Sequence, residues 1–218
     1  MSSERLSGDG GRRRYHTPKR TARARATRER IRATAEALFL RDGYARTSMS
    51  AVAKAAGVAE KTVYLAFPTK ADLLNEIIVT ALRAEDAPRP FRTRPREALA
   101  APSEQLVAQF AALSADVMAR TARVMALGES AASTDPQLAE LRERGHAAMR
   151  SDCRDVADAL AAQGALASDI TTDTAANTLY AIVNESVYLR LVDGCGWTPN
   201  EYHSWLARTL RKALLGQP

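Results

Sequence analysis

Three side chains that can donate hydrogen bonds lie close together in residues 57–70, GVAEKTVYLAFPTK. Lys61, Thr62 and Tyr64 could each donate to a phosphate oxygen or to the edge of a base. Their spacing places them, in a helix, on the side that faces away from a core. The pattern therefore suggests a nucleic-acid contact, provided that the neighbouring residues form a short, well-anchored helix.

The residues around this segment predict such an anchor. Gly57 ends a preceding apolar helix, and Pro68 prevents the next helix from continuing, so only about two turns remain between them. Val63 and Phe67 would face the core, and the small side chain of Ala53 would let the two helices cross closely. Ala53, Gly57 and Val63 together predict a helix-turn-helix, whose second helix lies in a major groove of DNA.

The rest of the chain predicts an all-α fold of about eight or nine helices, because Ala, Leu, Arg and Glu dominate and apolar residues recur at three- and four-residue steps. A first helix should begin near Thr27 and end near Asp42, a second should be capped by Ser48 or Ser50, and a fourth should start with Thr69 and Asp72 in a capping box. Later helices are expected near 102–128, 136–163, 169–193 and 199–215.

Composition divides the chain into four parts. Residues 1–25 are rich in Gly, Ser, Pro and Arg without periodic apolar residues, and we expect a disordered basic arm there. Residues 26–86 would form the helix-turn-helix domain, and the proline-rich residues 87–96, APRPFRTRPR, a linker. Residues 97–218 would form a larger helical body.

The excess positive charge lies in the arm. The chain has a net charge of +6, and residues 1–32 hold 11 Lys/Arg against 3 Asp/Glu, so the remainder is slightly acidic. The arm could follow a neighbouring minor groove or the DNA backbone, or it could be a solvated, mobile tail. Its candidate DNA contacts are Arg12, Arg13, Arg14, Arg23 and Arg25.

Several classes of protein are disfavoured. Cys153 and Cys195 have neither CxxC spacing nor a histidine at metal-ligand spacing, so we expect reduced thiols in a cytoplasmic protein without a metal site or cofactor. No apolar run is long enough for a membrane span or a secretory signal. Motifs of nucleotide-binding loops, zinc proteases and serine hydrolases are missing, which argues against an enzyme.

Residues 27–75, TRERIRATAEALFLRDGYARTSMSAVAKAAGVAEKTVYLAFPTKADLLN, resemble the DNA-binding domain of the TetR family of bacterial transcriptional repressors. The likeness rests on an ordered set of positions: Leu38-Phe39, Gly43-Tyr44, Thr47-Ser48, Ala53, Ala56-Gly57-Val58, Thr62-Val63-Tyr64, Phe67 and Lys70. Two positions depart from the usual pattern, because Ala59 and Ala66 replace polar residues common in the family.

The resemblance implies roles for particular residues. Phosphate contacts are expected from Thr47 or Ser48, Thr62, Tyr64 and Lys70, with Lys61 placed for a base or phosphate contact. It also implies that the C-terminal body dimerises through its last two helices and encloses a small-molecule pocket. Candidate interface residues are Val187, Leu191, Trp205, Leu206 and Leu210, for which plain intramolecular core is an equal alternative.

Candidate pocket residues are Phe110, Met118, Met125, Met149, Tyr180, Asn184, Tyr188 and Trp197, although Met and aromatic residues at helical spacing are more often core. The expected function is a ligand-responsive regulator, most simply a repressor, that binds a palindromic DNA operator as a homodimer. The alternatives are a non-specific architectural DNA-binding protein and, less readily, an enzyme or an activator.

Overall fold

The computed structural model describes residues 18–83 and 99–216, and within these ranges every long element is a helix. The first four are α1 (Pro18–Asp42), α2 (Met49–Ala56), α3 (Glu60–Ala66) and α4 (Lys70–Leu82). The C-terminal body comprises α5 (Ser103–Ala131), α6 (Pro136–Ala162), α7 (Thr172–Ile182), α8 (Glu185–Leu189), a π-helical turn (Arg190–Gly194) and α9 (Pro199–Leu214). The predicted all-α class is confirmed.

Helix ends lie where the local sequence predicts them. Gly43 and Gly57 follow α1 and α2 with φ angles of 88° and 63°, left-handed conformations that favour glycine. Thr69 and Asp72 form the predicted capping box of α4, and Thr198 with Glu201 forms the same motif at α9. These motifs end one helix and start the next at defined positions.

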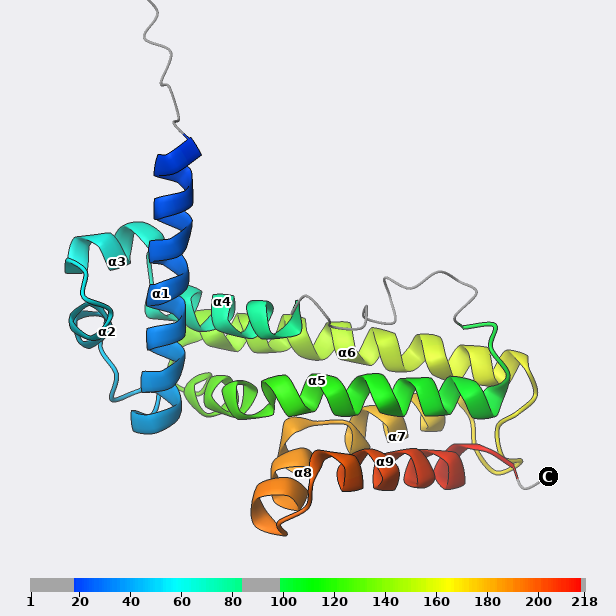
Figure 1. The fold of residues 1–218 in the computed structure, drawn as a ribbon. Coiled ribbons are helices and arrows are strands. Elements are labelled where there is room, and N and C mark those ends of the chain that lie inside the picture. Colours follow the sequence, from blue (N-terminus) through cyan, green and yellow to red (C-terminus); the bar gives the residue numbers. More distant parts are fainter. Residues whose placement is uncertain (1–17, 84–98, 217–218) are drawn as a thin grey trace, which may run out of the picture.

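The long helices α5 and α6 run side by side as a hairpin, with α7 and α9 packed along one side (Figure 1). The helices α1–α4 lie at the end of this hairpin where α5 turns into α6, and the N-terminal end of α1 projects beyond them. This arrangement places α3 on the outside of the molecule.

Two apolar clusters hold these parts together. One lies among α5–α9 and includes Cys153, Leu160 and Tyr202. The other lies among α1–α4, but it also contains Val124 and Leu138 from the α5–α6 hairpin. The core beneath the helix-turn-helix is therefore completed by residues from the C-terminal body.

Two predicted elements differ from the structure. The helix α1 begins at Pro18, so residues 18–25 are helical and not a disordered arm. Proline suits the first position of a helix, and the Ala and Arg residues that follow have high helix propensity. The rest of the predicted arm and the linker at 87–96 lie outside the described residues.

The single helix predicted over 169–193 is wrong, because α7 ends at Ile182. Val183 has a ψ of 86°, and Asn184 caps α8 by accepting a hydrogen bond from the amide of Val187 at 2.9 Å. Asn favours caps over helix interiors because its side chain competes for backbone groups. No described helix is long and apolar enough to cross a lipid bilayer.

Candidate DNA-binding face

The helices α2 and α3 form a helix-turn-helix. Ser48 caps α2 by accepting from the amide of Ala51 at 3.0 Å, and the amide of Gly57 closes the helix on the carbonyl of Ala53. The side chain of Val63 is fully buried between the helices and α1. The predicted pairing of a small residue, a glycine turn and a β-branched residue is present in the structure.

The helix α3 divides cleanly into an inner and an outer face. Val63 and the capping residue Phe67 are buried, whereas Lys61 and Tyr64 are exposed and Thr62 is partly exposed. These three polar side chains are thus free to contact a ligand outside the protein. Ala59 occupies the N-cap position of α3 and makes no side-chain hydrogen bond.

Thr47 and Lys70, both predicted to contact phosphates, hold the helix-turn-helix in place in this structure. The side chain of Thr47 is buried and donates to the carbonyl of Gly43 at 3.0 Å. The Lys70 ammonium donates to the carbonyls of Tyr44 and Thr47 at 2.9 and 3.1 Å and lies 4.2 Å from the centre of the Tyr44 ring. Burial lowers the pKa of Lys70, and Asp135 nearby partly offsets this shift.

Ser48, the alternative to Thr47, is exposed, although its hydroxyl is engaged as the cap of α2.

Sequence reasoning missed the structural role of Thr47 and Lys70 because their hydrogen-bond partners are backbone carbonyls in a turn. It also missed Arg28, which donates to the carbonyl of Ala66, stacks 4.0 Å from the Phe67 ring and pairs with Glu76 at 3.2 Å. Arg28 thereby fastens the end of α3 to α1 and α4.

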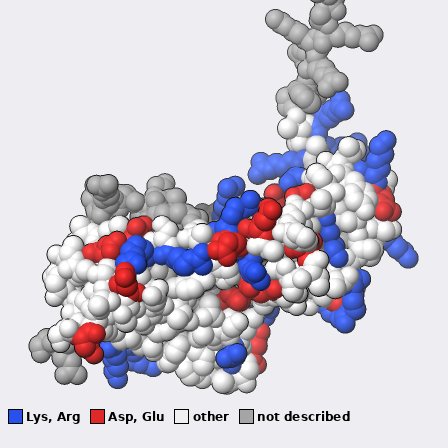
Figure 2. Space-filling view, turned by 180° about the vertical axis from the view of Figure 1, so that it is seen from behind, with Lys and Arg blue, Asp and Glu red and all other residues white. Residues whose placement is uncertain are grey.

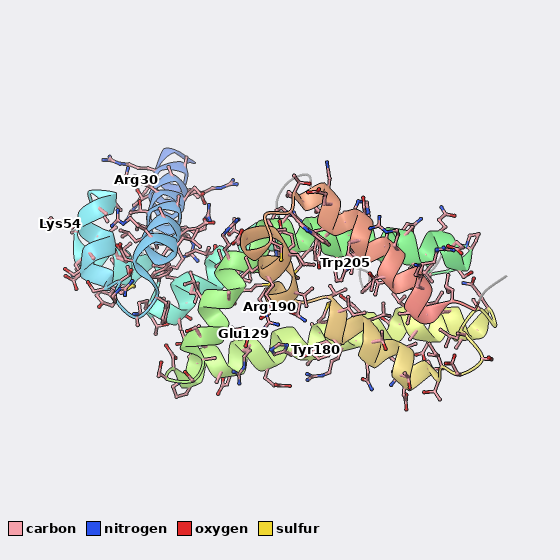
Figure 3. The ribbon with its side chains drawn as sticks, turned by 90° about the horizontal axis from the view of Figure 1, so that it is seen from below. Arg30, Lys54, Glu129, Tyr180, Arg190 and Trp205 are labelled. Carbon is pink, nitrogen blue, oxygen red and sulfur yellow. The ribbon has the colours of Figure 1, made fainter. Side chains whose placement is uncertain are left out.

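Basic side chains are concentrated on the N-terminal helices. Figure 2 shows Lys and Arg gathered on the N-terminal helices and the projecting end of α1, whereas charges of both signs mix on the body. Arg23 and Arg25 are exposed on α1, and the predicted Arg12, Arg13 and Arg14 lie outside the described residues. Arg30 of α1 and Lys54 of α2 also point outward (Figure 3).

Polar contacts join the helix-turn-helix to the turn between α5 and α6. The hydroxyl of Tyr44 donates to Asp135 at 3.2 Å, and burial with the nearby carboxylate raises the Tyr44 pKa. Gln137 accepts from Thr69 at 3.0 Å and donates to Asp72 at 2.8 Å, so it grips the capping box of α4. We call Tyr44, Thr69, Asp72, Asp135 and Gln137 the junction.

The predicted pocket residues have different surroundings within the body. Phe110, Met118 and Tyr188 are buried in the core of the body, and Asn184 is the cap described above. Met125, Met149 and Tyr180 are partly buried at the edge of this core. Trp197 alone lines a depression of about 400 Å³, on the surface of α9 with Asn200, Glu201, Ser204 and Arg208.

Tyr180 has a polar partner that the sequence did not predict. Its hydroxyl lies 2.8 Å from Nδ1 of His146, whose Nε2 lies 3.0 Å from Glu129. His146 therefore bridges α5 and α7 from its place on α6. Figure 3 shows Glu129 and Tyr180 at this meeting point of the helices.

The predicted interface residues fall into two groups. Leu206 and Leu210 are fully buried inside the body, so the core alternative is correct for both. Val187, Leu191 and Trp205 are only partly buried, and Trp205 packs edge-on against Trp197 at 6.1 Å between ring centres. Within the described residues no group of His, Cys, Asp and Glu side chains could hold a metal ion.

Comparison with known proteins agrees with this geometry. Residues 31–77 match the family described as bacterial regulatory proteins, tetR family, and this range contains the C-terminal half of α1, all of α2 and α3 and the beginning of α4. A search of curated proteins found no significant match.

Solved structures share the fold over nearly the whole chain. NalD from Pseudomonas aeruginosa, described as the secondary repressor of the MexAB-OprM multidrug efflux pump, is 22% identical with a TM-score of 0.67, covering 89% of this chain and 98% of its own. SmeT, solved with triclosan, is 20% identical with a TM-score of 0.64, covering 88% and 93% of the two chains. A regulator from Saccharomonospora viridis, solved with choline, is 19% identical with a TM-score of 0.61, covering 88% and 100%. The match to the tetR family of bacterial regulatory proteins thus lies in residues 31–77, the part of the chain that contains the helix-turn-helix, while the solved structures share the fold of the whole.

Proposed function

We propose that this chain is a cytoplasmic, homodimeric transcriptional repressor that binds a palindromic operator and is released from it by a small-molecule effector. The outer face of α3 carries the proposal, because Lys61 and Tyr64 are exposed on a helix whose inner face is buried. A helix anchored in this way can enter a major groove without losing its packing. Residues 26–86 would form the DNA-binding domain, residues 87–96 a linker and residues 97–218 the regulatory body.

A homodimer fits the geometry of DNA recognition. One helix-turn-helix reads only a few base pairs, and two half-sites about 34–36 Å apart on the same side of the duplex require two copies. The partly exposed Val187, Leu191 and Trp205 supply apolar contacts for a second copy. We place the dimer contact on the outer side of α8 and α9.

Release by an effector would work through linkage. A ligand that binds the DNA-incompetent form more tightly lowers operator affinity by the ratio of its two affinities. The solved complexes of SmeT with triclosan and of the Saccharomonospora viridis regulator with choline support a small molecule as the effector. The edge of the body core near Met125, Met149 and Tyr180 is our candidate region for its binding.

The test is to select DNA from a random-sequence duplex library with the unmodified protein and to measure dissociation constants for the selected duplex at several salt concentrations. Lys61→Ala and Tyr64→Ala should weaken binding, and Lys61→Ala should reduce the salt slope by about one. Lys212→Ala, an exposed lysine of α9, is the matched control and should bind like the parent. Equal binding by all four proteins would contradict the assignment of α3.

A second candidate is a non-specific architectural protein, favoured by the exposed Arg23 and Arg25 on the projecting end of α1. The same measurements separate the two functions. An architectural protein would enrich no sequence and would bind selected and random duplexes equally at physiological salt.

A further inference from the structure

The side chain of Leu65 is far more exposed than any other large apolar side chain of the described residues. Leu65 is 78% exposed, compared with 46% for Tyr64, 44% for Leu40 and 38% for Leu82. Isolated exposed leucines are common and need no explanation by themselves. The position of Leu65 on α3 makes this one different.

Leu65 points directly away from the core. Successive residues of an α-helix are turned by about 100°, so Leu65 lies about 200° around α3 from the buried Val63. Lys61, four residues earlier, lies on the same outward line. Thr62 and Tyr64 lie on either side of this line. If α3 enters a major groove, the outward line with Lys61 and Leu65 faces the bases. Thr62 and Tyr64 then face the two phosphate backbones that border the groove.

The exposed basic side chains of α1, α2 and α3 fit DNA better than an apolar protein surface as the partner of this region. Lys61, Arg30 and Lys54 are exposed on three different helices of the helix-turn-helix, and none of them forms an ion pair with a residue that the structure describes. Their combined positive charge favours a polyanion. An apolar protein partner would instead need a continuous apolar patch around Leu65.

A leucine has only one kind of partner in a major groove. Its side chain has no hydrogen-bond donor or acceptor, and the one apolar group on the groove floor is the C5-methyl group of thymine. We propose that Leu65 is a specificity-determining residue that contacts a thymine methyl group in each half-site. This inference rests on the proposed function, because it requires that α3 enter the major groove.

The experiment uses the duplex selected from the random library. Each thymidine is replaced in turn by 2′-deoxyuridine, which pairs identically but lacks the methyl group, and dissociation constants are measured. For the unmodified protein, replacement at one position of each half-site should weaken binding about fourfold, the factor expected for burying one methyl-sized group. Leu65→Ala should bind the thymidine duplex more weakly and should show no difference between thymidine and deoxyuridine at that position.

Two further variants separate a methyl contact from a general loss of fit. Leu65→Met keeps an apolar side chain and should retain part of the discrimination. Leu40→Ala removes an exposed leucine from α1 and should leave the discrimination unchanged. Because Leu65 is exposed, neither substitution there should lower the thermal midpoint.

The outcomes distinguish the inference from the function on which it rests. If the protein enriches a sequence but Leu65→Ala keeps the full discrimination, or the unmodified protein shows none, the role of Leu65 is wrong and operator binding stands. If no sequence is enriched, both proposals are wrong.

Discussion

At the residue scale, the two cysteines have opposite environments. Cys153 is fully buried in the core of the body, and this burial, with a smaller effect from Asp152, raises the pKa of its thiol to about 12. Cys195 is exposed after the π-helical turn. Because the thiolate is the reactive form, only Cys195 can react readily.

We therefore predict that Ellman's reagent at pH 8 modifies one thiol per chain rapidly in the folded protein. The second thiol should react only after denaturant unfolds the core. Cys195→Ser should abolish the rapid reaction, whereas Cys153→Ala should preserve it. Two rapid thiols per chain would show that the core around Cys153 opens easily.

At the element scale, the second helix of the helix-turn-helix, α3, lacks a side-chain cap. Ala59 has φ and ψ of −67° and 144°, the extended conformation that capping residues adopt, but no oxygen to accept a hydrogen bond. Ser48, Thr69 and Thr198 provide such oxygens at α2, α4 and α9. The start of α3 is thus a weak point among the helices of this chain.

Ala59→Ser should therefore raise the free energy of unfolding by about 0.5–1 kcal/mol, measured by urea denaturation. Ala55→Ser is the matched control, because it places the same side chain at an exposed position inside α2, where serine is slightly unfavourable. A larger gain from Ala55→Ser would contradict the capping argument.

The elements also show how far the sequence predicts this molecule. Gly43, Gly57 and Pro68 act on the backbone locally, so the C-terminal ends of α1, α2 and α3 were predictable from the residues alone, whereas the start of α1 was not. Lys61, Thr62 and Tyr64 were predictable as an outer face because helical periodicity fixes which side is buried. The break between α7 and α8 at Asn184 could not be predicted, because a single polar residue in an apolar stretch is consistent both with a buried polar contact and with a helix cap.

The contacts of Thr47, Lys70 and His146 could not be predicted for a related reason. Lys70 and His146 bond to residues of other segments, at Tyr44, Glu129 and Tyr180, and Thr47 bonds to Gly43 across a folded turn. Without the packing of the helices, each of these polar residues is equally consistent with a ligand contact and with an internal one.

At the scale of the whole molecule, the junction links the helices α1–α4 to the C-terminal body. Tyr44 and Gln137 make side-chain hydrogen bonds between α1–α4 and the α5–α6 turn. Each such bond contributes about 1 kcal/mol of net stability. Tyr44→Phe keeps the ring against Phe39 and Lys70 but removes the bond to Asp135.

We predict that the double variant Tyr44→Phe, Gln137→Ala exchanges its backbone amide hydrogens faster in α2–α4 than the parent does, with little change in α7 and α9. Hydrogen exchange followed by mass spectrometry of peptides would measure this. Gln163→Ala is the control, since the side chain of Gln163 donates to the carbonyl of Ala101 within the body. Unchanged exchange in α2–α4 would show that apolar packing alone joins the two parts.

That apolar packing has a consequence for how such proteins can recombine. The helix-turn-helix core includes Val124, Ala131 and Leu138, which come from the α5–α6 hairpin. If residues 18–83 alone were transplanted to another protein, part of their apolar core would be exposed to solvent. If the end of the α5–α6 hairpin were transplanted with them, this core would stay buried. The unit that evolution or an engineer can exchange is therefore larger than the helices α1–α4, and it is discontinuous in sequence.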